Sequence, residues 1–249
     1  ERLSDVNNAL ANPDIRALFC ARGGYGSARI VDAIDYDSLS TNPKIIVGYS
    51  DITTLLIAIT KKTGLITFHG PLIGSQKVST WSYQMMLRQL TSSEKAFIWP
   101  SPPDGFPPPQ IIRSGSGSGP LVGGCLSILS TLSGTVNQPD TSGSVLFMEE
   151  VAEAPYRVDR LLSHLHHSGW FNNPSGILIG AFERCIQRDE DQEPSLSISE
   201  ILQDRFSEKS FPVLSGLPIG HGRHNITIPV GIECMIEESQ IIQLHSGIM

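Results

Sequence analysis

Residues 44–70 alternate between two apolar runs and a helical pattern, and this alternation constrains the fold more than any other feature of the sequence. KIIVG (44–48) and LITFHG (65–70) have the length and composition of buried strands, and residues 51–62 between them carry apolar side chains at helical spacing. Apolar strands that alternate with helices are typical of a parallel sheet covered on both faces. We therefore predict an α/β fold.

A segment rich in proline, glycine and serine divides the chain. Residues 99–119, with the sequence WPSPPDGFPPPQIIRSGSGSG, favour turns and irregular backbone over a helix or strand. We interpret them as a linker between a parallel-sheet N-terminal domain at 1–98 and a smaller α+β C-terminal domain at 120–249. At 249 residues, the chain is long enough for both domains to bury a core.

Composition and charge exclude several classes of protein. A net charge of −7 argues against a nucleic-acid-binding protein, which normally has a basic face. No apolar run approaches the roughly 18 residues that span a bilayer, and there is no signal peptide, so no membrane partner is expected. The four cysteines lie far apart without a C-x-x-C pair, which predicts reduced thiols in a cytoplasmic protein rather than disulfides or a zinc site.

Ser50 lies where a predicted strand meets a predicted helix. A strand ending at Gly48, a serine two residues later and an immediate helix form the geometry of a nucleophile elbow, which exposes a hydroxyl beside the free N–H groups of the first helical turn. The match to G-x-S-x-G is incomplete, because Ile52 occupies the position of the second glycine. This stretch alone favours the plainer interpretation that Ser50 or Asp51 caps the helix.

A serine nucleophile needs a base, and several histidines are candidates. His221, in LPIGHGRHN, lies on a glycine-flanked loop from which an imidazole could reach a cleft. His224 follows in the same loop, and His69 lies at the end of a predicted strand. Three further histidines crowd one predicted helix at 155–169. Because no acidic or cysteine ligands accompany them, a solvated polar face explains those three better than a metal site does.

The carboxylate that orients the base is expected in FMEEV (147–151). Glu149 and Glu150 lie at the end of an otherwise apolar strand, and their side chains must point to opposite faces. One can be solvated, whereas the other faces inward and needs a partner. A buried acid could orient a loop histidine, and an ion pair with Arg157 or Arg160 is the alternative.

The glycine turn RGGYG (22–26) is a candidate anion site. Consecutive backbone N–H groups at such a turn can hold a phosphate or the oxyanion of an acyl-transfer reaction. The turn matches neither the P-loop nor the full G-x-G-x-x-G pattern, so nucleotide binding through those motifs is not expected. Apolar residues at helical spacing (30–34) predict a helix behind the turn.

Together these stretches resemble the LD-carboxypeptidase family of serine peptidases, which includes muramoyl-tetrapeptide carboxypeptidases and microcin-immunity proteins. The matching stretches occur in the family's order and cover nearly all of the chain. They are ARGGYGSARI, VGYSDITTLL, TFHGP, GPLVGGCLS, LFMEEVAEAPYRVDRLL, GILIGAF and LPIGHG.

The resemblance implies a triad of Ser50 in GYSD, Glu149 in FMEE and His221 in PIGH. It selects Glu149 over Glu150 and His221 over His224, which the spacing of the residues does not do. His221 would remove the proton as Ser50 attacks a carbonyl, and would return it to the departing amine. Glu149 would fix the imidazole tautomer and stabilise the imidazolium.

The same resemblance implies an oxyanion hole, a substrate and a compartment. Backbone N–H groups of Gly24 and Asp51 would form the hole, which is worth about 3–4 kcal/mol in comparable hydrolases. The substrate would be a small peptide, a muropeptide of cytoplasmic murein recycling, cut between an L-centre and a terminal D-alanine. No cofactor and no metal are expected. A homodimer is left open.

Two features depart from the family's pattern. The family usually starts with a further strand–helix unit of some tens of residues, and the sequence that begins at Glu1 lacks it. Many members have Gly-Gly-Asn-Leu where this chain has Gly123-Gly124-Cys125-Leu126. A thiol thus replaces an amide that could bond substrate or backbone, which bears on fine specificity.

Two other functions stay open at this point. A microcin-immunity-type amidohydrolase would use the same triad on an aminoacyl-nucleotide, and it would need an aromatic platform for the base, for which Trp81, Trp99 and Trp170 are available. A non-catalytic anion- or sugar-binding module would use RGGYG as its cradle. Replacing Ser50 would leave ligand binding by such a module intact.

Overall fold

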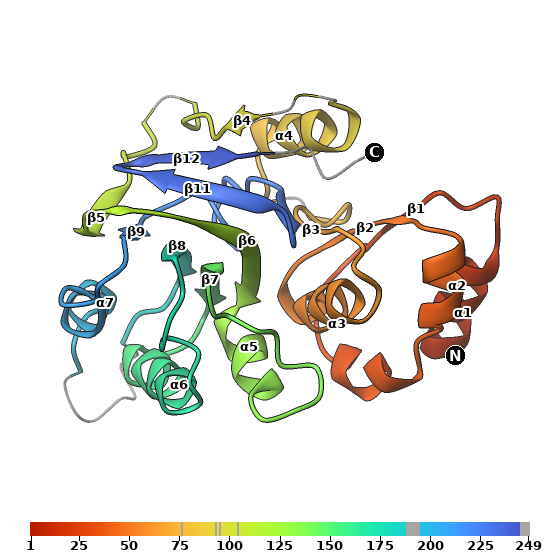
Figure 1. Cartoon of the computed structure of the whole chain (residues 1–249), viewed down its shortest axis with the longest axis horizontal. Helices are drawn as coiled ribbons and strands as arrows, with labels where there is room; N and C mark the ends of the chain where they lie inside the picture. The colour runs from red at the N-terminus through yellow and green to blue at the C-terminus, as the bar shows by residue number, and fades with distance from the viewer. Residues whose placement is uncertain (76, 93, 95, 104, 188–194, 245–249) are drawn as a thin grey trace.

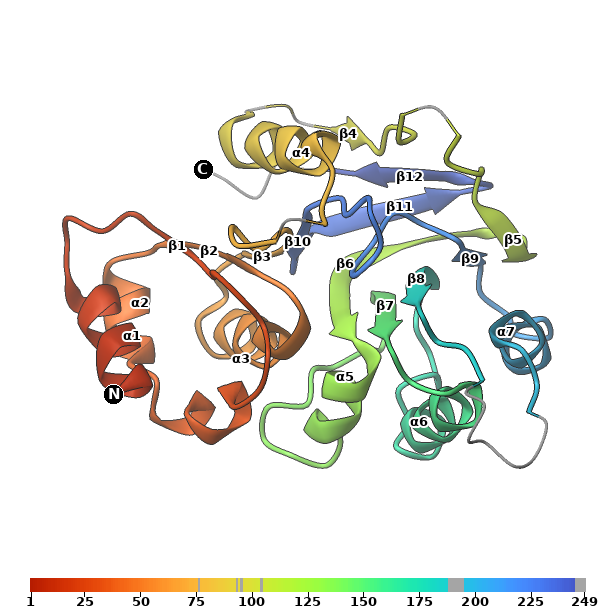
Figure 2. The ribbon, with the colours of Figure 1, turned by 180° about the vertical axis from the view of Figure 1, so that it is seen from behind.

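The first of two sheets is built mainly from the front of the chain. The computed structural model describes residues 1–75, 77–92, 94, 96–103, 105–187 and 195–244. In spatial order, the strands of the first sheet are β1 (Ala17–Phe19), β2 (Ile45–Gly48), β3 (Thr67–His69) and β10 (Ile228–Val230). The first three run parallel, and β10 is antiparallel to β3, beside which it lies in Figure 2. Because β10 comes from near the end of the chain, both halves of the sequence share this sheet.

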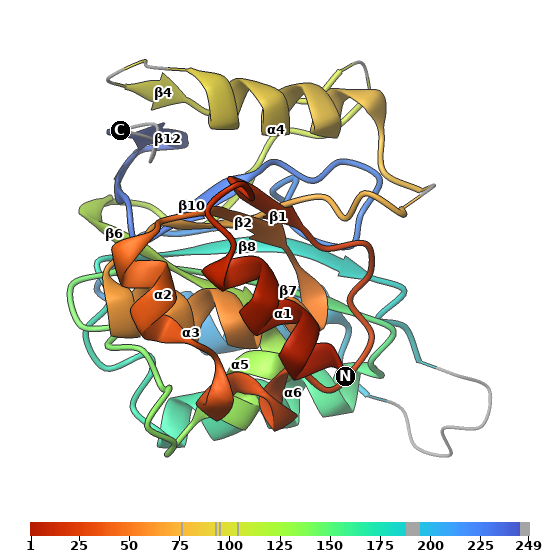
Figure 3. The same ribbon diagram turned by 90° about the vertical axis from the view of Figure 1, so that its right-hand side faces the viewer.

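Helices cover both faces of the first sheet, as the continuously apolar strands predict. The helices of this half are α1 (Arg2–Ala11), α2 (Tyr36–Thr41), α3 (Thr53–Thr63) and α4 (Thr80–Thr91). Ile46 packs with apolar residues of α1, α2 and α3, whereas Val47 and Phe68 pack with α4. Figure 3 shows α4 on the opposite side of the sheets from the other three helices. The parallel, doubly covered sheet predicted from the sequence is therefore confirmed.

The end of α3 connects the two halves of the chain. Gly64 ends the helix at φ 72°, a left-handed conformation that glycine adopts without a Cβ clash. In the last turn, the Lys61 ammonium donates to the carbonyls of Val136 and Gln138 at 2.8 and 2.6 Å. A cation at a helix C-terminus is favourable, and here it also binds a loop from the second half.

Among the described residues, the second sheet has eight strands, twice as many as the first. β6 to β9 run parallel, and the other pairs are antiparallel. Figure 1 shows this sheet beside the first. In spatial order, its strands are β4 (Phe97–Ile98), β12 (Gln240–Gln243), β11 (Glu233–Glu237), β6 (Ser116–Cys125), β7 (Val145–Val151), β8 (Gly176–Glu183), β9 (Val213–Ser215) and β5 (Gln110–Arg113).

Both faces of β7 are buried. On one face, Leu146 and Met148 pack with the apolar sides of three helices, and on the other, Val145 and Phe147 pack with β10, β11 and β12. The helices are α5 (Leu126–Leu132), α6 (Pro155–His167) and α7 (Ile198–Phe206). Pro155 begins α6 at a position where a missing N–H costs nothing. Glu149 and Glu150 thus end a strand that has no solvent-facing side.

The prediction of irregular backbone over 99–119 is wrong for its second part. Residues 110–113 form β5, and β6 begins at Ser116. The glycines that suggest a flexible linker are strand residues here, because a side chain at Gly117 would overlap the carbonyl of Ser175, and one at Gly119 the carbonyl of Gly143. The division of the chain at 99–119 stays a prediction.

The helix predicted behind the RGGYG turn is also wrong. Two short 3-10 turns, Ser27–Arg29 and Val31–Ala33, occupy this segment. The hydroxyl of Tyr36 donates to the Val31 carbonyl at 2.6 Å, so that carbonyl bonds a side chain instead of continuing a helix. Across the part of the chain that the structure describes, no helix has the length and apolar character needed to cross a bilayer.

Candidate active site

Ser50 has a strained backbone at the start of a helix. Its φ is 64°, a left-handed conformation that is uncommon for residues other than glycine. Tyr49 before it is extended, and the short turn Ser50–Ile52 leads directly into α3. Within this described stretch, neither the turn nor α3 has a side-chain cap, so the capping interpretation is not supported. Strain of this kind, which costs roughly 1–3 kcal/mol, persists at functional turns where the surroundings enforce it.

The RGGYG turn packs against Ser50. A Cβ at Gly23 would lie 2.8 Å from the Ser50 Cβ and 3.0 Å from its Oγ, so only glycine allows this approach. Asp51, which could also have capped the helix, reaches the same segment. Its carboxylate accepts from the Ser27 backbone N–H at 2.9 Å and from the Ser27 hydroxyl at 2.8 Å. These contacts hold the glycine turn beside the serine, although the two are 24 or more residues apart in sequence.

Glu149 and His221 form a buried pair. The His221 Nδ1 lies 2.6 Å from the Glu149 Oε2, and the His221 backbone N–H donates to the same oxygen at 3.2 Å. The Glu149 side chain has no exposed surface, whereas 15% of the His221 side chain is exposed. The structure therefore brings together the acid of β7 and the histidine of the glycine-flanked loop.

The surroundings of Glu149 favour its ionised form. Burial by itself raises the pKa of a carboxyl group, but the hydrogen bond with His221 and the nearby His69 imidazole together outweigh burial and lower the pKa of Glu149 to about 2. An ionised carboxylate can only accept hydrogen bonds, so the proton of the short contact belongs to Nδ1 of His221. The other ring nitrogen, Nε2, is then free to act as a base.

Gly220 makes the contact between Glu149 and the histidine loop possible. It has a φ of 90°, and a Cβ there would overlap the Glu149 carboxylate. Glycine therefore allows the loop to approach the acid closely and to direct the next N–H group at it. The flanking glycines of LPIGHG are a visible signal in the sequence, but their partner on β7 is not.

Tyr49 connects the serine to the Glu149–His221 pair. Its ring lies edge-on to the His221 ring, with centroids 4.7 Å apart, and it also contacts the His69 ring at 5.9 Å. Because Tyr49 precedes Ser50 directly, the aromatic contact brings the strained turn next to the histidine loop. Local sequence reasoning missed this tyrosine.

Comparison with known proteins shows the family of this chain. The family model described as the LD-carboxypeptidase N-terminal domain matches residues 1–70, and the one described as the LD-carboxypeptidase C-terminal domain matches residues 118–236. A probable murein peptide carboxypeptidase from Bacillus subtilis is 34% identical over 96% of this chain and 74% of its own length. This chain belongs to the LD-carboxypeptidase family. The family is one of serine peptidases.

Solved structures of the family have the same fold. The muramoyltetrapeptide carboxypeptidase from Oxalobacter formigenes superposes with a TM-score of 0.81 at 31% identity, covering 97% of this chain and 82% of that one. The microcin C7 self-immunity protein MccF, in complex with aspartyl sulfamoyl adenosine, superposes with a TM-score of 0.88 at 27% identity, covering 100% of this chain and 81% of that one. An MccF variant with a serine, an asparagine and a lysine replaced by alanine is described as an active-site mutant.

The other candidate residues lie elsewhere in the structure. Glu150 points to the opposite face of β7, where its carboxylate accepts from the backbone N–H groups of Ser127 at 2.7 Å and Val151 at 2.8 Å. The Nδ1 of His224 lies 2.9 Å from the Ser79 hydroxyl, away from Glu149. The predicted alternative, an ion pair of the β7 acid with an arginine of α6, does not occur at Glu149, whose described partners are histidines.

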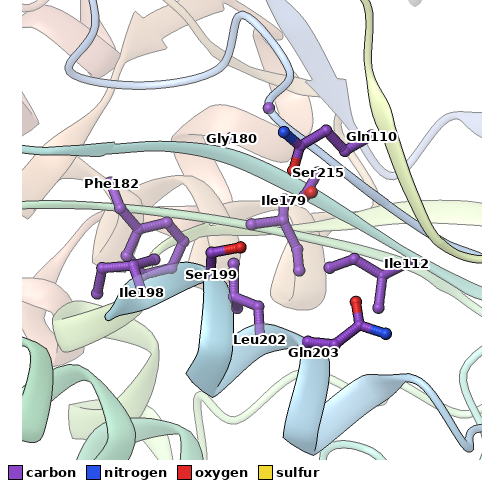
Figure 4. A pocket seen from close by; sticks show the side chains of 11 residues that line it. Gln110, Ile112, Ile179, Gly180, Phe182, Ile198, Ser199, Leu202, Gln203 and Ser215 are labelled. Carbon is purple, nitrogen blue, oxygen red and sulfur yellow. The ribbon is translucent and has the colours of Figure 1, made fainter. Parts of the chain in front are cut away.

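In the described part of the chain, neither a cluster of metal ligands nor the cavity shown in Figure 4 coincides with these residues. Among the residues that the structure describes, no group of three or more metal-ligating side chains comes together. A cavity of about 190 Å³ opens between α7, β5, β8 and β9, as Figure 4 shows. Its lining is neutral and mixed in polarity, and it includes none of Ser50, Glu149 and His221.

Proposed function

We propose that this chain is a serine carboxypeptidase that removes the terminal D-alanine from peptidoglycan tetrapeptides by cutting an L-to-D-alanine bond. The observation that carries the proposal is the buried Glu149–His221 pair beside the strained serine turn. Family membership and the relatives named as murein and muramoyltetrapeptide carboxypeptidases support the substrate class. We place the reaction in the cytoplasm, where the four free cysteines would stay reduced.

In the proposed reaction, Ser50 attacks the scissile carbonyl while His221 takes its proton. Because Nδ1 of His221 is engaged by Glu149, Nε2 is the nitrogen that accepts the proton and then passes it to the departing amine of D-alanine. Water, activated by the same nitrogen, hydrolyses the acyl-enzyme. The ionised Glu149 stabilises the imidazolium that forms during both steps.

Backbone N–H groups of Gly24 and Asp51 would stabilise the oxyanion. Asp51 lies in the first turn of a helix, where N–H groups have no acceptor within the helix. Gly24 has a φ of 93° and belongs to the turn that packs on Ser50. Two donors from separate segments that meet at the nucleophile fit the requirements of an oxyanion hole.

Arg22 is the cation we assign to the free carboxylate of the terminal D-alanine. Its side chain is exposed, and a Cβ at Gly24 would lie 3.4 Å from its guanidinium group, so the cation borders the proposed oxyanion hole. In the described part of the chain, Arg22 has no ion-pair partner. A carboxypeptidase must recognise a terminal carboxylate, and a guanidinium group suits this because it can bind both oxygens.

Mass spectrometry of a peptidoglycan tetrapeptide incubated with the protein tests the function. We expect wild-type protein to release one D-alanine, and Ser50→Ala to release none above background. A tripeptide product from the Ser50→Ala variant at the wild-type rate would contradict the proposed nucleophile. If wild-type protein leaves the tetrapeptide intact, the proposed substrate is wrong.

An aromatic cluster on the histidine loop favours a second candidate function. Trp81 and Phe106 each contact the His224 ring edge-on, with ring centroids 5.7 and 5.6 Å from it. Trp170 is fully buried and donates to Ser133, so it is not available to a ligand. A cluster of this kind could support the base of an aminoacyl-nucleotide, and MccF has been solved with such a ligand analogue. Assaying an aminoacyl sulfamoyl adenosine beside the tetrapeptide separates the two substrates.

A further inference from the structure

We infer that His69 is a positioning residue, which holds the second carboxylate oxygen of Glu149 and aligns the Glu149–His221 pair with the strand that carries Ser50. This inference rests on the proposed function. It adds a residue that touches neither substrate nor the reacting atoms and acts through Glu149.

The carboxylate oxygens of Glu149 have unequal partners. Oε2 receives two donors, Nδ1 and the backbone N–H of His221. Oε1 is buried and has no hydrogen-bond partner among the described residues. The Nε2 of His69 faces it at 3.6 Å, and both side chains have no exposed surface. A buried carboxylate oxygen without a donor is unfavourable, so the facing imidazole is the group that stabilises it.

Aromatic rings surround the His69 imidazole. Neither of its ring nitrogens has a hydrogen-bond partner in the described structure, so no competing bond holds the ring back. It is bordered by Tyr49 and Phe147, whose rings meet it edge-on at centroid distances of 5.9 and 5.2 Å. A shift of about 0.5 Å would bring Nε2 within ordinary hydrogen-bond distance of Oε1.

His69 also lies between the two halves of the site. It is paired in parallel register with Gly48, and Gly70 donates to the Gly48 carbonyl at 3.0 Å, two residues before the nucleophile. On its other side, His69 is paired with Ile228 of β10. Glu149 belongs to the second sheet, so the His69–Glu149 contact connects the strand next to the nucleophile with the acid that orients the base.

The inference predicts a change in the pH dependence of the site. Glu149 on β7, His221 on its loop and Tyr49 after β2 are titratable groups around His69. Cys125 at the end of β6 and Glu150 next along β7 also interact with Glu149, and burial raises the pKa of Tyr49, Cys125 and Glu150. Without a donor on Oε1, the ionised Glu149–His221 pair is less stable and takes up a proton at higher pH. A side chain that only fills space would leave this proton uptake unchanged.

Three substitutions of His69 separate the effect of hydrogen-bond donation from the effect of packing. The amide nitrogen of His69→Gln can reach the position of Nε2, the shorter His69→Asn places its amide near Nδ1, and His69→Leu has no donor. The readout is the rate at which a fluorophosphonate labels Ser50 between pH 4 and 9, with thermal unfolding as a check on folding.

We expect Ser50 of the Gln variant to be labelled at close to the wild-type rate. The acid limb of its pH profile, the low-pH range over which the labelling rate falls, should be unchanged. The Asn and Leu variants should label about 10- to 100-fold more slowly at neutral pH, the range of one hydrogen bond to a charged group, with the acid limb about one pH unit higher. Should Leu fail to fold, the Gln and Asn variants still decide. An acid limb that does not move in Asn, or that moves equally in Gln, overturns the inference.

The outcome also separates this inference from the proposed function. If the fluorophosphonate does not label Ser50 in the wild-type protein, the proposed nucleophile is wrong. If the wild-type protein is labelled and all folded His69 variants share its pH profile, the nucleophile stands and the positioning role of His69 is wrong.

Discussion

Glu149 and Glu150 are adjacent on β7, almost equally buried, and surrounded in opposite ways. Glu149 is 0% exposed and faces two imidazoles, whereas Glu150 is 2% exposed and accepts backbone N–H groups at the start of α5. Burial raises the pKa of Glu150. In Glu149 the neighbouring histidines reverse that effect and lower the pKa.

Burial alone does not assign a role to a carboxylate. Its partners decide whether it is held ionised for catalysis or bound into the backbone. In the proposed reaction, the imidazole donor His221 makes Glu149 part of the proton-transfer site. Fixed N–H donors, such as that of Ser127, make Glu150 a structural connection between β7 and α5.

The largest expected difference between the two acids is in turnover. Glu149→Gln removes the charge that fixes the His221 tautomer, and we expect kcat/KM on the tetrapeptide to fall by about 10³–10⁴-fold. Glu150→Gln keeps an acceptor for the Ser127 and Val151 N–H groups, and its kcat/KM should stay within about tenfold of wild type. Steady-state kinetics of the two folded variants measures both.

A reversal of that order would show that the acid on the α5 face orients the base. Equal losses in both variants would indicate a general effect of disturbing β7 rather than a specific role for Glu149.

Gly220 offers a second test of the role of Glu149. A Cβ at Gly220 would overlap the Glu149 carboxylate, so Gly220→Ala should displace the acid from His221 and lower kcat/KM by about 10²-fold or more. Gly216 is a matched control, since its φ of 73° is also left-handed but a Cβ there meets nothing within 4 Å. Gly216→Ala should therefore show only backbone strain of about 1–2 kcal/mol in unfolding and near-normal kinetics. Equal kinetic losses would argue against the close approach at Gly220.

Most of the fold could be predicted from the sequence. Candidate site residues could also be proposed from local pattern, but that pattern did not select among them. The apolar runs at 44–48 and 65–70 determine buried strands locally, so they could be predicted. The alternation of β7 predicted opposite faces for Glu149 and Glu150 but not which face meets a histidine. That choice depends on His221, 72 residues away, and on the close approach at Gly220.

The features that sequence reasoning missed have the same physical origin. Glycines of β6 look like a flexible linker because the reason for them is the approach of carbonyls from Gly143 and Ser175, which local pattern does not reveal. His69 is visible as a histidine at a strand end, but its contact with Glu149 crosses from one sheet to the other. Long-range contacts of this kind are set by tertiary structure and not by propensity.

Acid unfolding should also distinguish the two carboxylates. The pKa of Glu149 is lowered from 4.5 to about 2 on folding, so its contribution to stability is present above pH 4.5 and is lost as the pH falls toward 2. The loss corresponds to roughly 3 kcal/mol, and it should be absent in Glu149→Gln.

The pKa of Glu150 is raised, so the stability of Glu150→Gln relative to wild type should increase as the pH rises. Urea unfolding at several pH values between 2 and 7 measures both effects. Parallel pH profiles for the two variants would contradict the difference in partners.

The smallest expected effect concerns substrate recognition beside the site. Arg22→Met removes the proposed partner of the terminal carboxylate and should raise KM about tenfold with little change in kcat. Arg29→Met is the control, because Arg29 is an exposed arginine of the same segment that donates to the Tyr25 hydroxyl. A tetrapeptide with an amidated C-terminus should bind both Arg22→Met and wild type weakly. If Arg22→Met retains the wild-type KM, another cation holds the carboxylate.

Covalent labelling tests most directly whether Glu149 and His221 activate Ser50. Wild type, His221→Ala, Glu149→Gln and Glu150→Gln are each treated with a fluorophosphonate at neutral pH, and the modified residue is located by peptide mass spectrometry. The account predicts modification of Ser50 in wild type and Glu150→Gln at similar rates, with labelling slowed at least 100-fold in the other two variants. Modification of a different serine, or equal labelling of Ser50 in all four proteins, would contradict it.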